Sequence, residues 1–183
     1  ALPIYLQDNP DADFSSIQDA IDAADDGYTI FVYPGTYFGP FGIESKSLSI
    51  IGSGFDSTFF DGNGLFRVMS AVTAQSLYLE GITVQSGYAS QQSPIQNRVG
   101  GGLLAVGVDD LRVRDCVFQG NQAEYQGGGV YAENVSSFDM TGTTFVDNLA
   151  GYEGLNSSNG PKGGAISLRG FGGDSETWCK IGR

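Results

Sequence analysis

Histidine is absent from this sequence of 183 residues. Catalysis by a serine–histidine–aspartate triad, proteolysis by a cysteine–histidine pair and zinc binding through imidazole all need that side chain, so these kinds of site are excluded within the chain. Cysteine is also scarce, because only Cys116 and Cys179 occur and they permit at most one disulfide bond. Cys116 falls on a predicted inward strand position, so we expect a buried free thiol there and no bond between the two.

Basic residues are few as well. Nine Lys and Arg stand against 21 Asp and Glu, and the net charge is −12. A polyanion would be repelled by this charge, so nucleic acid is excluded as a partner. No cofactor is predicted, but Ca²⁺ stays open because carboxylates bind it, and no particular metal ligands are assigned. The alternative is that the acidic surface serves solubility alone.

Long hydrophobic runs are missing too. No stretch of 18 apolar residues occurs, so no membrane-spanning helix is predicted. The sequence opens at Ala1 with neither the charged nor the hydrophobic region of a signal peptide, which we interpret as a mature N-terminus after signal removal. This interpretation predicts a secreted or cell-surface protein.

The residues that are abundant indicate many short strands joined by tight turns: 28 Gly, 12 Phe and 9 Tyr. Only residues 13–27 predict a helix, with apolar residues at helical spacing on one face and Asp13 or the acidic turn before it as the N-cap. The apolar face comprises Phe14, Ile17, Ile21 and Ala24. Within a chain of strands, such a helix is expected to cap an open end.

Internal repetition gives the architecture. The run GGGL at 100–103 recurs as GGGV at 127–130 and GGAI at 163–166, and FQGN at 118–121 recurs as FVDN at 145–148. The first two copies of each motif are separated by 27 residues. Copies that repeat in the same direction stack in parallel, about 4.8 Å apart. We therefore predict an all-β, right-handed parallel β-helix, with a cap helix at 13–27, stacked rungs over 28–168 and a tail at 169–183, in one domain spanning 1–183.

Alternation of period two within each copy fixes the register. Leu77, Leu79, Ile82 and Val84 align with Leu111, Val113, Cys116 and Phe118, and then with Phe138, Met140, Thr143 and Phe145. Phe118 is therefore expected to stack between Val84 and Phe145. Asn121 and Asn148 are predicted to take the left-handed conformation of a turn and to bond along the stack through their amides, with Gly87 at the same position one rung earlier. The register also aligns Glu80 with Arg114, Arg112 with Asp139, and Glu133 with Arg169 as ion pairs.

Two resemblances support this architecture. The alternation of GG[GA][LVI] with FxxN is similar to the repeat of the chlamydial polymorphic outer-membrane-protein passengers and of related bacterial surface β-helices. The opening segment SSIQDAIDAADDGYTIFVYPGTY resembles the start of pectin-lyase-like proteins, where a cap helix precedes a strand ending in PGTY. Together they cover about 13–37 and 77–168. They imply the fold and a surface location, and because such folds occur in lyases, esterases and adhesins, function has to be argued from a site.

The candidate binding site comes from two insertions. From the inward Phe or Val to the glycine run there are 9 residues in the middle copy, but 16 in the copy before it and 18 in the copy after it. We expect the two long loops, 86–99 and 148–162, to emerge side by side and flank Tyr125. Aromatic and amide side chains suit sugar rings, although loops also tolerate insertions without a function. The predicted binding residues are Tyr88, Gln96, Arg98, Tyr125, Tyr152 and Asn156.

An enzymatic alternative rests on Arg112, Arg114 and Asp115. Lyase-like β-elimination on an acidic polysaccharide needs a basic residue beside carboxylate-held Ca²⁺. The register gives both arginines ordinary ion-pair partners, so no catalytic residue is predicted. We expect a secreted or surface module that binds glycans or a cell-surface partner, as an adhesin does, and the polysaccharide lyase-like enzyme is the second hypothesis. The tail at 169–183 shows no periodicity; Trp178 is expected to cover the last rung, and an uncovered edge there would allow self-association.

Overall fold

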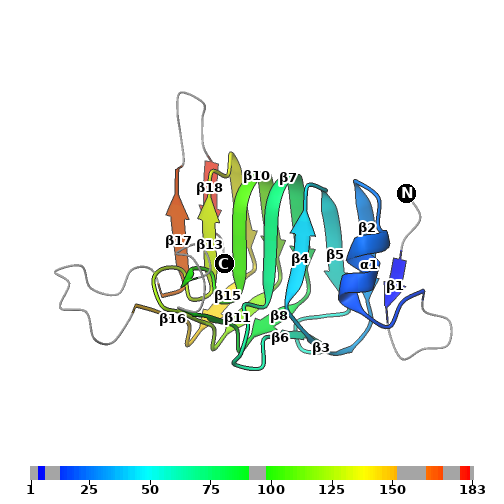
Figure 1. The fold of residues 1–183 in the computed structure, drawn as a ribbon, viewed down its shortest axis with the longest axis horizontal. Coiled ribbons are helices and arrows are strands. Elements are labelled where there is room, and N and C mark those ends of the chain that lie inside the picture. Colours follow the sequence, from blue (N-terminus) through cyan, green and yellow to red (C-terminus); the bar gives the residue numbers. More distant parts are fainter. Residues whose placement is uncertain (1–3, 7–12, 91–97, 152–163, 171–177, 182–183) are drawn as a thin grey trace.

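The computed structural model describes residues 4–6, 13–90, 98–151, 164–170 and 178–181, with the backbone alone described for 4–6 and 178–181. Apart from one helix, the elements of this part of the chain are strands, and each strand pair runs parallel. Figure 1 shows the strands standing side by side along the long axis of the molecule. The prediction of a mostly β chain with parallel sheets is confirmed.

The largest sheet has ten strands in the order β1-β2-β5-β7-β10-β13-β17, and in addition β4 pairs with β7 while β14 pairs with β10 and β18. Its strands are β1 (Ile4–Leu6), β2 (Tyr28–Val32), β4 (Phe41–Glu44), β5 (Leu48–Gly52), β7 (Met69–Glu80), β10 (Leu103–Arg114), β13 (Val130–Glu133), β14 (Ser137–Thr141), β17 (Ile166–Arg169) and β18 (Trp178–Ile181). The long strands β7 and β10 each take part in two stretches of this sheet: the first residues of β10 pair with β13 and its last residues pair with β14.

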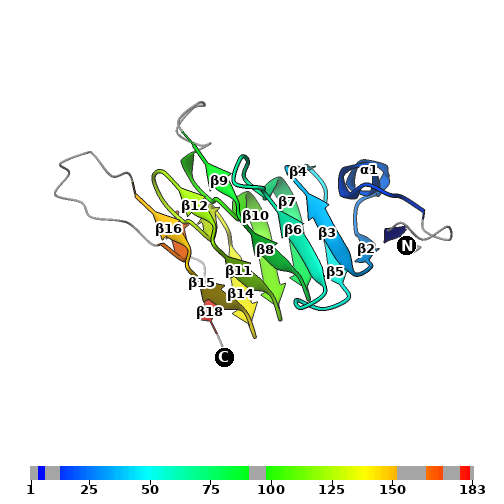
Figure 2. The same ribbon diagram turned by 90° about the horizontal axis from the view of Figure 1, so that it is seen from below.

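Two smaller sheets complete the arrangement (Figure 2). One has the order β15-β11-β8-β6-β3 and the other β16-β12-β9. Their strands are β3 (Gly35–Phe38), β6 (Thr58–Asp61), β8 (Thr83–Gln85), β9 (Tyr88–Ala89), β11 (Val117–Gln119), β12 (Gln122–Ala123), β15 (Thr144–Val146) and β16 (Leu149–Ala150).

The chain visits the three sheets in turn and returns one strand further along, and we call each such passage a coil. One coil runs from the last residues of β10 through β11 and β12 to β13, and the next runs from β14 through β15 and β16 to β17. Adjacent coils are offset by 27 residues at Leu103↔Val130, as predicted, and by 34 residues at Met69↔Leu103, where a loop is inserted. This succession is consistent with a parallel β-helix.

The core is formed by the inward positions that the register predicted. Phe118 is fully buried and pairs with Val84 on one side and Phe145 on the other. The rings of Phe118 and Phe145 stack with centroids 5.1 Å apart and planes 9° apart. The predicted stacking of Phe118 is therefore confirmed.

The corners of the coils differ from the prediction by one residue. The left-handed residues beside the FxxN motifs are Ser86, Gly120 and Asp147, with φ of 52°, 61° and 52°, and not Asn121 or Asn148. The prediction of left-handed asparagines was wrong because the residue just before each asparagine makes the turn. Gly87 also has another reason to be glycine: a Cβ there would lie 2.0 Å from the carbonyl oxygen of Gly101.

The asparagines do bond along the stack, as predicted, and we call them the asparagine ladder. The Asn121 amide donates to the carbonyl of Val84 (2.9 Å) and accepts from the backbone N–H of Gly87 (2.9 Å) in the preceding coil. Asn148 repeats this one coil later: its amide donates to the carbonyl of Phe118 (2.8 Å) and accepts from the backbone N–H of Asn121 (3.1 Å). Asn121 is fully buried, so these bonds satisfy groups that water does not reach.

The predicted register of charged residues is correct, but two of the three ion pairs have other partners. Arg114 aligns with Glu80, and Arg112 aligns with Asp139. The guanidinium of Arg114, however, lies 3.7 Å from Asp139, and that of Arg112 lies 2.7 Å from Asp110 on its own strand. A long side chain reaches along its strand or diagonally to the next, so alignment alone does not decide its partner. The third pair, Glu133 with Arg169, forms at 3.9 Å.

Helix α1 spans Ile17–Ala23, so it is shorter than the predicted 13–27. Its N-cap is Ser16 and not Asp13, because the Ser16 side chain accepts from the backbone N–H of Asp19 at 3.4 Å. The side-chain amide of Gln18 accepts from the backbone N–H of Gly42 on β4 (2.8 Å) and donates to its carbonyl (3.1 Å). A side chain thus occupies the backbone groups that a neighbouring strand would otherwise bond. Within the described residues, no helix combines the length and apolar character that crossing a membrane requires.

The region predicted as a tail contains a strand. Strand β18 pairs with β14, so Cys179 aligns with Phe138 and Ile181 with Met140. The burial of Trp178 lies outside the described residues. Cys116 is a buried free thiol, as predicted, and burial raises its pKa to about 12.

Candidate functional site

The candidate site lies on the outer face of the large sheet, over the first residues of β10 and over β13 and β17. On these strands Leu103, Ala105, Val130 and Ala132 are fully buried in the core, so the residues between them face outward. The outward residues align as Leu104↔Tyr131↔Ser167 and Val106↔Glu133↔Arg169.

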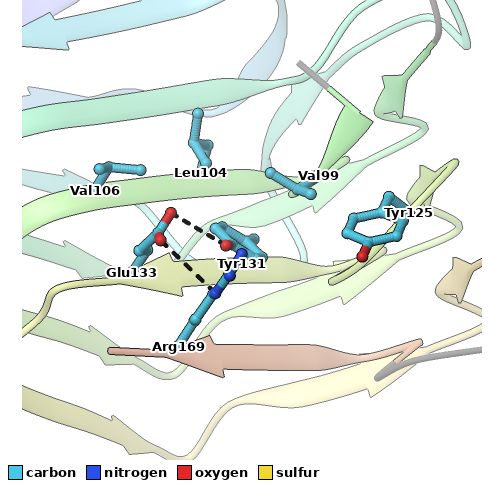
Figure 3. Close-up of a pocket in the computed structure, with 7 residues that line it drawn as sticks. All are labelled: Val99, Leu104, Val106, Tyr125, Tyr131, Glu133 and Arg169. Atoms are coloured by element: carbon cyan, nitrogen blue, oxygen red, sulfur yellow. Dashed lines mark hydrogen bonds and ion pairs between the residues drawn. The ribbon is translucent and has the colours of Figure 1, made fainter. Parts of the chain in front are cut away.

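Apolar residues fill an outer position where a strand usually carries polar ones. Leu104 and Tyr131 are only 6% and 3% exposed, and together with Val99 they form a second apolar cluster, separate from the main core, with Val106 packed against it. Beside this cluster lies a hollow of about 280 Å³. Its lining residues are Val99, Leu104, Val106, Tyr125, Tyr131, Glu133 and Arg169 (Figure 3).

The charged side of the hollow is built around Glu133. Its carboxylate accepts a hydrogen bond from the Tyr131 hydroxyl at 3.1 Å and lies 3.9 Å from the guanidinium of Arg169 (Figure 3). Burial raises the pKa of the Tyr131 phenol, so at neutral pH the hydroxyl keeps its proton and donates to the carboxylate. The neighbouring Tyr131, followed by Glu133, raises the pKa of Arg169, which stays charged. One carboxylate, one phenol and one guanidinium thus lie together beside an aliphatic surface.

Tyr125 forms the exposed aromatic side of the hollow. The ring is 44% exposed, and the residue lies in the turn between β12 and β13. Its backbone N–H donates to the carbonyl of Arg98 at 3.0 Å, and Val99 pairs with Gln126 beside it. Gly127, with φ of 62°, then turns the chain into β13. The position of Tyr125 is thus set by the backbone on both sides.

Of the six predicted binding residues, Tyr88, Arg98 and Tyr125 lie within the described part of the chain. Tyr88 and Arg98 are held by a residue that the prediction missed, Glu124, whose side chain is 9% exposed. Its carboxylate accepts from the Tyr88 hydroxyl at 3.1 Å and lies 3.3 Å from Nε of Arg98. Only Tyr125 among the described three lines the hollow. The other three, Gln96, Tyr152 and Asn156, lie outside the described residues.

The two long loops leave from neighbouring strands of one sheet. Tyr88 aligns with Gln122, and Gln122 aligns with Leu149, so the described starts of loops 86–99 and 148–162 are on either side of β12. The course of residues 91–97 and 152–163 lies outside the described part of the chain.

The residues of the enzymatic alternative lie on the second part of β10, on a different stretch from the hollow. Arg112 and Arg114 are each paired with a carboxylate, on Asp110 and Asp139. Asp115 has φ of 47° at a corner, and its carboxylate lies where a Cβ on Gly142 would be, 2.1 Å from that position. Within the described ranges, no three His, Cys, Asp or Glu side chains gather closely enough to hold a metal ion.

Sequence reasoning treated Glu133 and Arg169 as a surface ion pair and did not predict the hollow. The signal was present in the motifs: Leu103-Leu104 and Val130-Tyr131 each place an apolar residue at the outward position directly after the glycine run. A strand that is apolar on both faces indicates that its outer face is covered or binds something.

One comparison with known proteins bears on this region. Residues 115–133 match the model of the Chlamydia polymorphic membrane protein repeat. The matched stretch covers β11, β12 and β13, so it includes Tyr125, Tyr131 and Glu133 of the hollow. The match points to a protein associated with the cell surface or outer membrane. No curated protein matches the chain.

Proposed function

We propose that this chain is a stretch of a right-handed parallel β-helix, closed at one end by α1, that is displayed at the cell surface or secreted and binds carbohydrate through the hollow. The parallel sheets and the repeat match support the scaffold and its location. The bonds from Gln18 to Gly42 support a capping role for α1, because they cover the edge of β4.

The single observation that carries the binding proposal is the exposed ring of Tyr125 beside a hollow with charged groups on its other side. A sugar ring has an apolar C–H face and polar hydroxyls at its rim. The C–H face packs on the Tyr125 ring, while Glu133 accepts and Arg169 donates hydrogen bonds to the rim. A concave surface with a few convergent polar groups is the usual form of a small-ligand site.

A glycan array probed with the intact protein, followed by calorimetry on the glycans that bind, tests the proposal. Tyr125→Ala should weaken binding at least about tenfold, since aromatic contacts dominate such sites. Phe38→Ala is the matched control: Phe38 is another exposed aromatic, 65% accessible, on β3 in a different sheet. The absence of any bound glycan, or equal losses for the two variants, would rule the proposal out.

A further inference from the structure

We infer that the sugar taken by the hollow is an N-acetylated hexosamine, whose acetamido group contacts the aliphatic floor. This inference rests on the proposed function and deepens it. Three chemically different surfaces meet in the hollow: an aliphatic floor of Val99, Leu104 and Val106, a carboxylate on Glu133 and a guanidinium on Arg169. An acetamido group also has three chemically different parts, a methyl, an N–H donor and a carbonyl acceptor.

The floor argues against an unsubstituted hexose. None of the three floor side chains has a polar atom, and Val99 and Leu104 are already buried in the second apolar cluster. A sugar hydroxyl pressed against this floor would leave water without gaining a partner, which is unfavourable. A methyl group placed there removes apolar surface from water on both sides, which is favourable.

The charged groups match the amide. Glu133 has accepted one hydrogen bond, from Tyr131, and its carboxylate can accept another from an N–H. Arg169 lies 3.9 Å from that carboxylate, which is longer than a hydrogen bond, and its side chain is 65% exposed. Its donors are therefore accessible to a carbonyl oxygen. A single amide that donates to Glu133 and accepts from Arg169 bridges the two.

The same groups discriminate against the charged sugars closest to this one. A hexosamine without its acetyl group brings an ammonium that suits Glu133 but is repelled by Arg169, and it has no methyl for the floor. A uronic acid brings a carboxylate that suits Arg169 but is repelled by Glu133. Only the neutral amide satisfies both charges, so the hollow selects by charge as well as by shape.

The experiment compares the methyl glycosides of N-acetylglucosamine, glucosamine and glucose by calorimetry and saturation-transfer NMR on the intact protein. We expect the N-acetylated glycoside to bind at least about tenfold more tightly than the other two, a discrimination typical of one apolar group in a pocket. The strongest saturation transfer should fall on the acetyl methyl.

Val106→Thr replaces a floor methyl by a hydroxyl at nearly constant volume and should reduce the preference for the acetyl group about threefold or more. Val117→Thr is the matched control, because Val117 is a half-buried residue on β11 that pairs with Thr83 and Thr144, away from the hollow. Its glycan preference should stay unchanged.

The failures are distinguishable. Equal affinity for glucose and its N-acetylated counterpart, with Tyr125 still required, would overturn the acetamido inference and leave the proposed function standing. Absence of binding by all three glycosides and on the glycan array would overturn both. Tyr125-dependent binding of an N-acetylated peptide, without binding of any glycan, would also overturn both, because the partner would then be a polypeptide.

Discussion

The two halves of β10 have opposite outer surfaces on a shared core. The first half presents Leu104 and Val106 to the hollow, whereas the second half presents Asp110, Arg112 and Arg114 to solvent. The second half has more charge, yet its arginines are paired with carboxylates on their own or the next strand. The first half has little charge, yet its aliphatic surface lies beside a carboxylate and a guanidinium that are accessible. Charge density alone is therefore a poor guide to function here, and apolar residues in outward positions are a better one.

The largest expected effect is on the core that both halves share. Phe118→Ala removes a fully buried ring stacked on Phe145, and it should lower the free energy of unfolding by about 3–5 kcal/mol. Denaturant unfolding measures this loss. Phe38→Ala, on the exposed ring, should change stability by less than about 0.5 kcal/mol. Similar losses for the two variants would contradict the register.

The asparagine ladder comes next. Asn121→Ala leaves the carbonyl of Val84 and the N–H of Gly87 without their side-chain partner in a buried corner, and we expect a loss of about 2–3 kcal/mol. Gln122→Ala, at the neighbouring exposed position, is the control and should have little effect. A loss no larger than the control's would show that water reaches this corner.

Two tyrosines test the difference between the halves of β10 most directly. Tyr131 donates to Glu133 in the hollow, and Tyr78 donates to Glu80 beside Arg112. Tyr131→Phe should weaken glycan binding about threefold to tenfold, because the carboxylate loses the donor that orients it. Tyr78→Phe removes the equivalent hydroxyl from the other stretch and should leave binding unchanged. Calorimetry on both variants gives the comparison, and equal effects would contradict it.

Alkaline pH provides a smaller and independent effect. Burial, followed by the bond to Glu80, raises the pKa of Tyr78 to about 12, above the value of 10 that an unperturbed tyrosine has. The protonated phenol is therefore favoured in the folded protein, and its contribution to stability is complete below pH 10 and is lost as the pH rises toward 12. Unfolding measured from pH 9 to 12 should show a smaller pH-dependent loss in Tyr78→Phe than in the parent. Identical profiles would show that Tyr78 is not perturbed.

The smallest effects are expected for the arginines of the second half. Arg112→Ala and Arg114→Ala each remove a half-exposed ion pair and should cost less than about 1 kcal/mol, since exposed pairs contribute little. Neither should alter glycan binding. An assay for unsaturated uronate products from acidic polysaccharide belongs with these variants: activity in the parent that either substitution abolishes would support the lyase alternative instead.

The sequence predicted the register of the strands well, because a period of two and a repeat of 27 residues are set by the backbone and the core. Leu77, Leu111 and Phe138 align as expected for this reason. It predicted side-chain partners less well. The reach of Arg112 to Asp110 depends on the length and direction of a flexible side chain, which periodicity does not determine. The left-handed residue at each corner was displaced by one for a related reason, since both asparagine and its neighbour can occupy such a turn.

The candidate site was only partly predictable. Tyr125 was identified because it lies between two long insertions. Glu124 was missed, because nothing in its spacing shows that its carboxylate holds Tyr88 and Arg98. The hollow requires the outer faces of three strands to be considered together, and it becomes visible only when Val99 and Arg169, 70 positions apart in the sequence, are brought to the same surface.

The asparagine ladder gives the stack a direction. Asn121 bonds backward to Val84 and Gly87, and its own backbone N–H is bonded in turn by Asn148 from the coil that follows. The corner of one coil is therefore completed by the next. In a solenoid each repeat contacts only its neighbours, and a chain emerges from the ribosome with its N-terminus first. We expect these corners to close in the order of synthesis, each protected from amide exchange only after its successor has folded, so that the backward-reaching amides couple the growth of the stack to the growth of the chain.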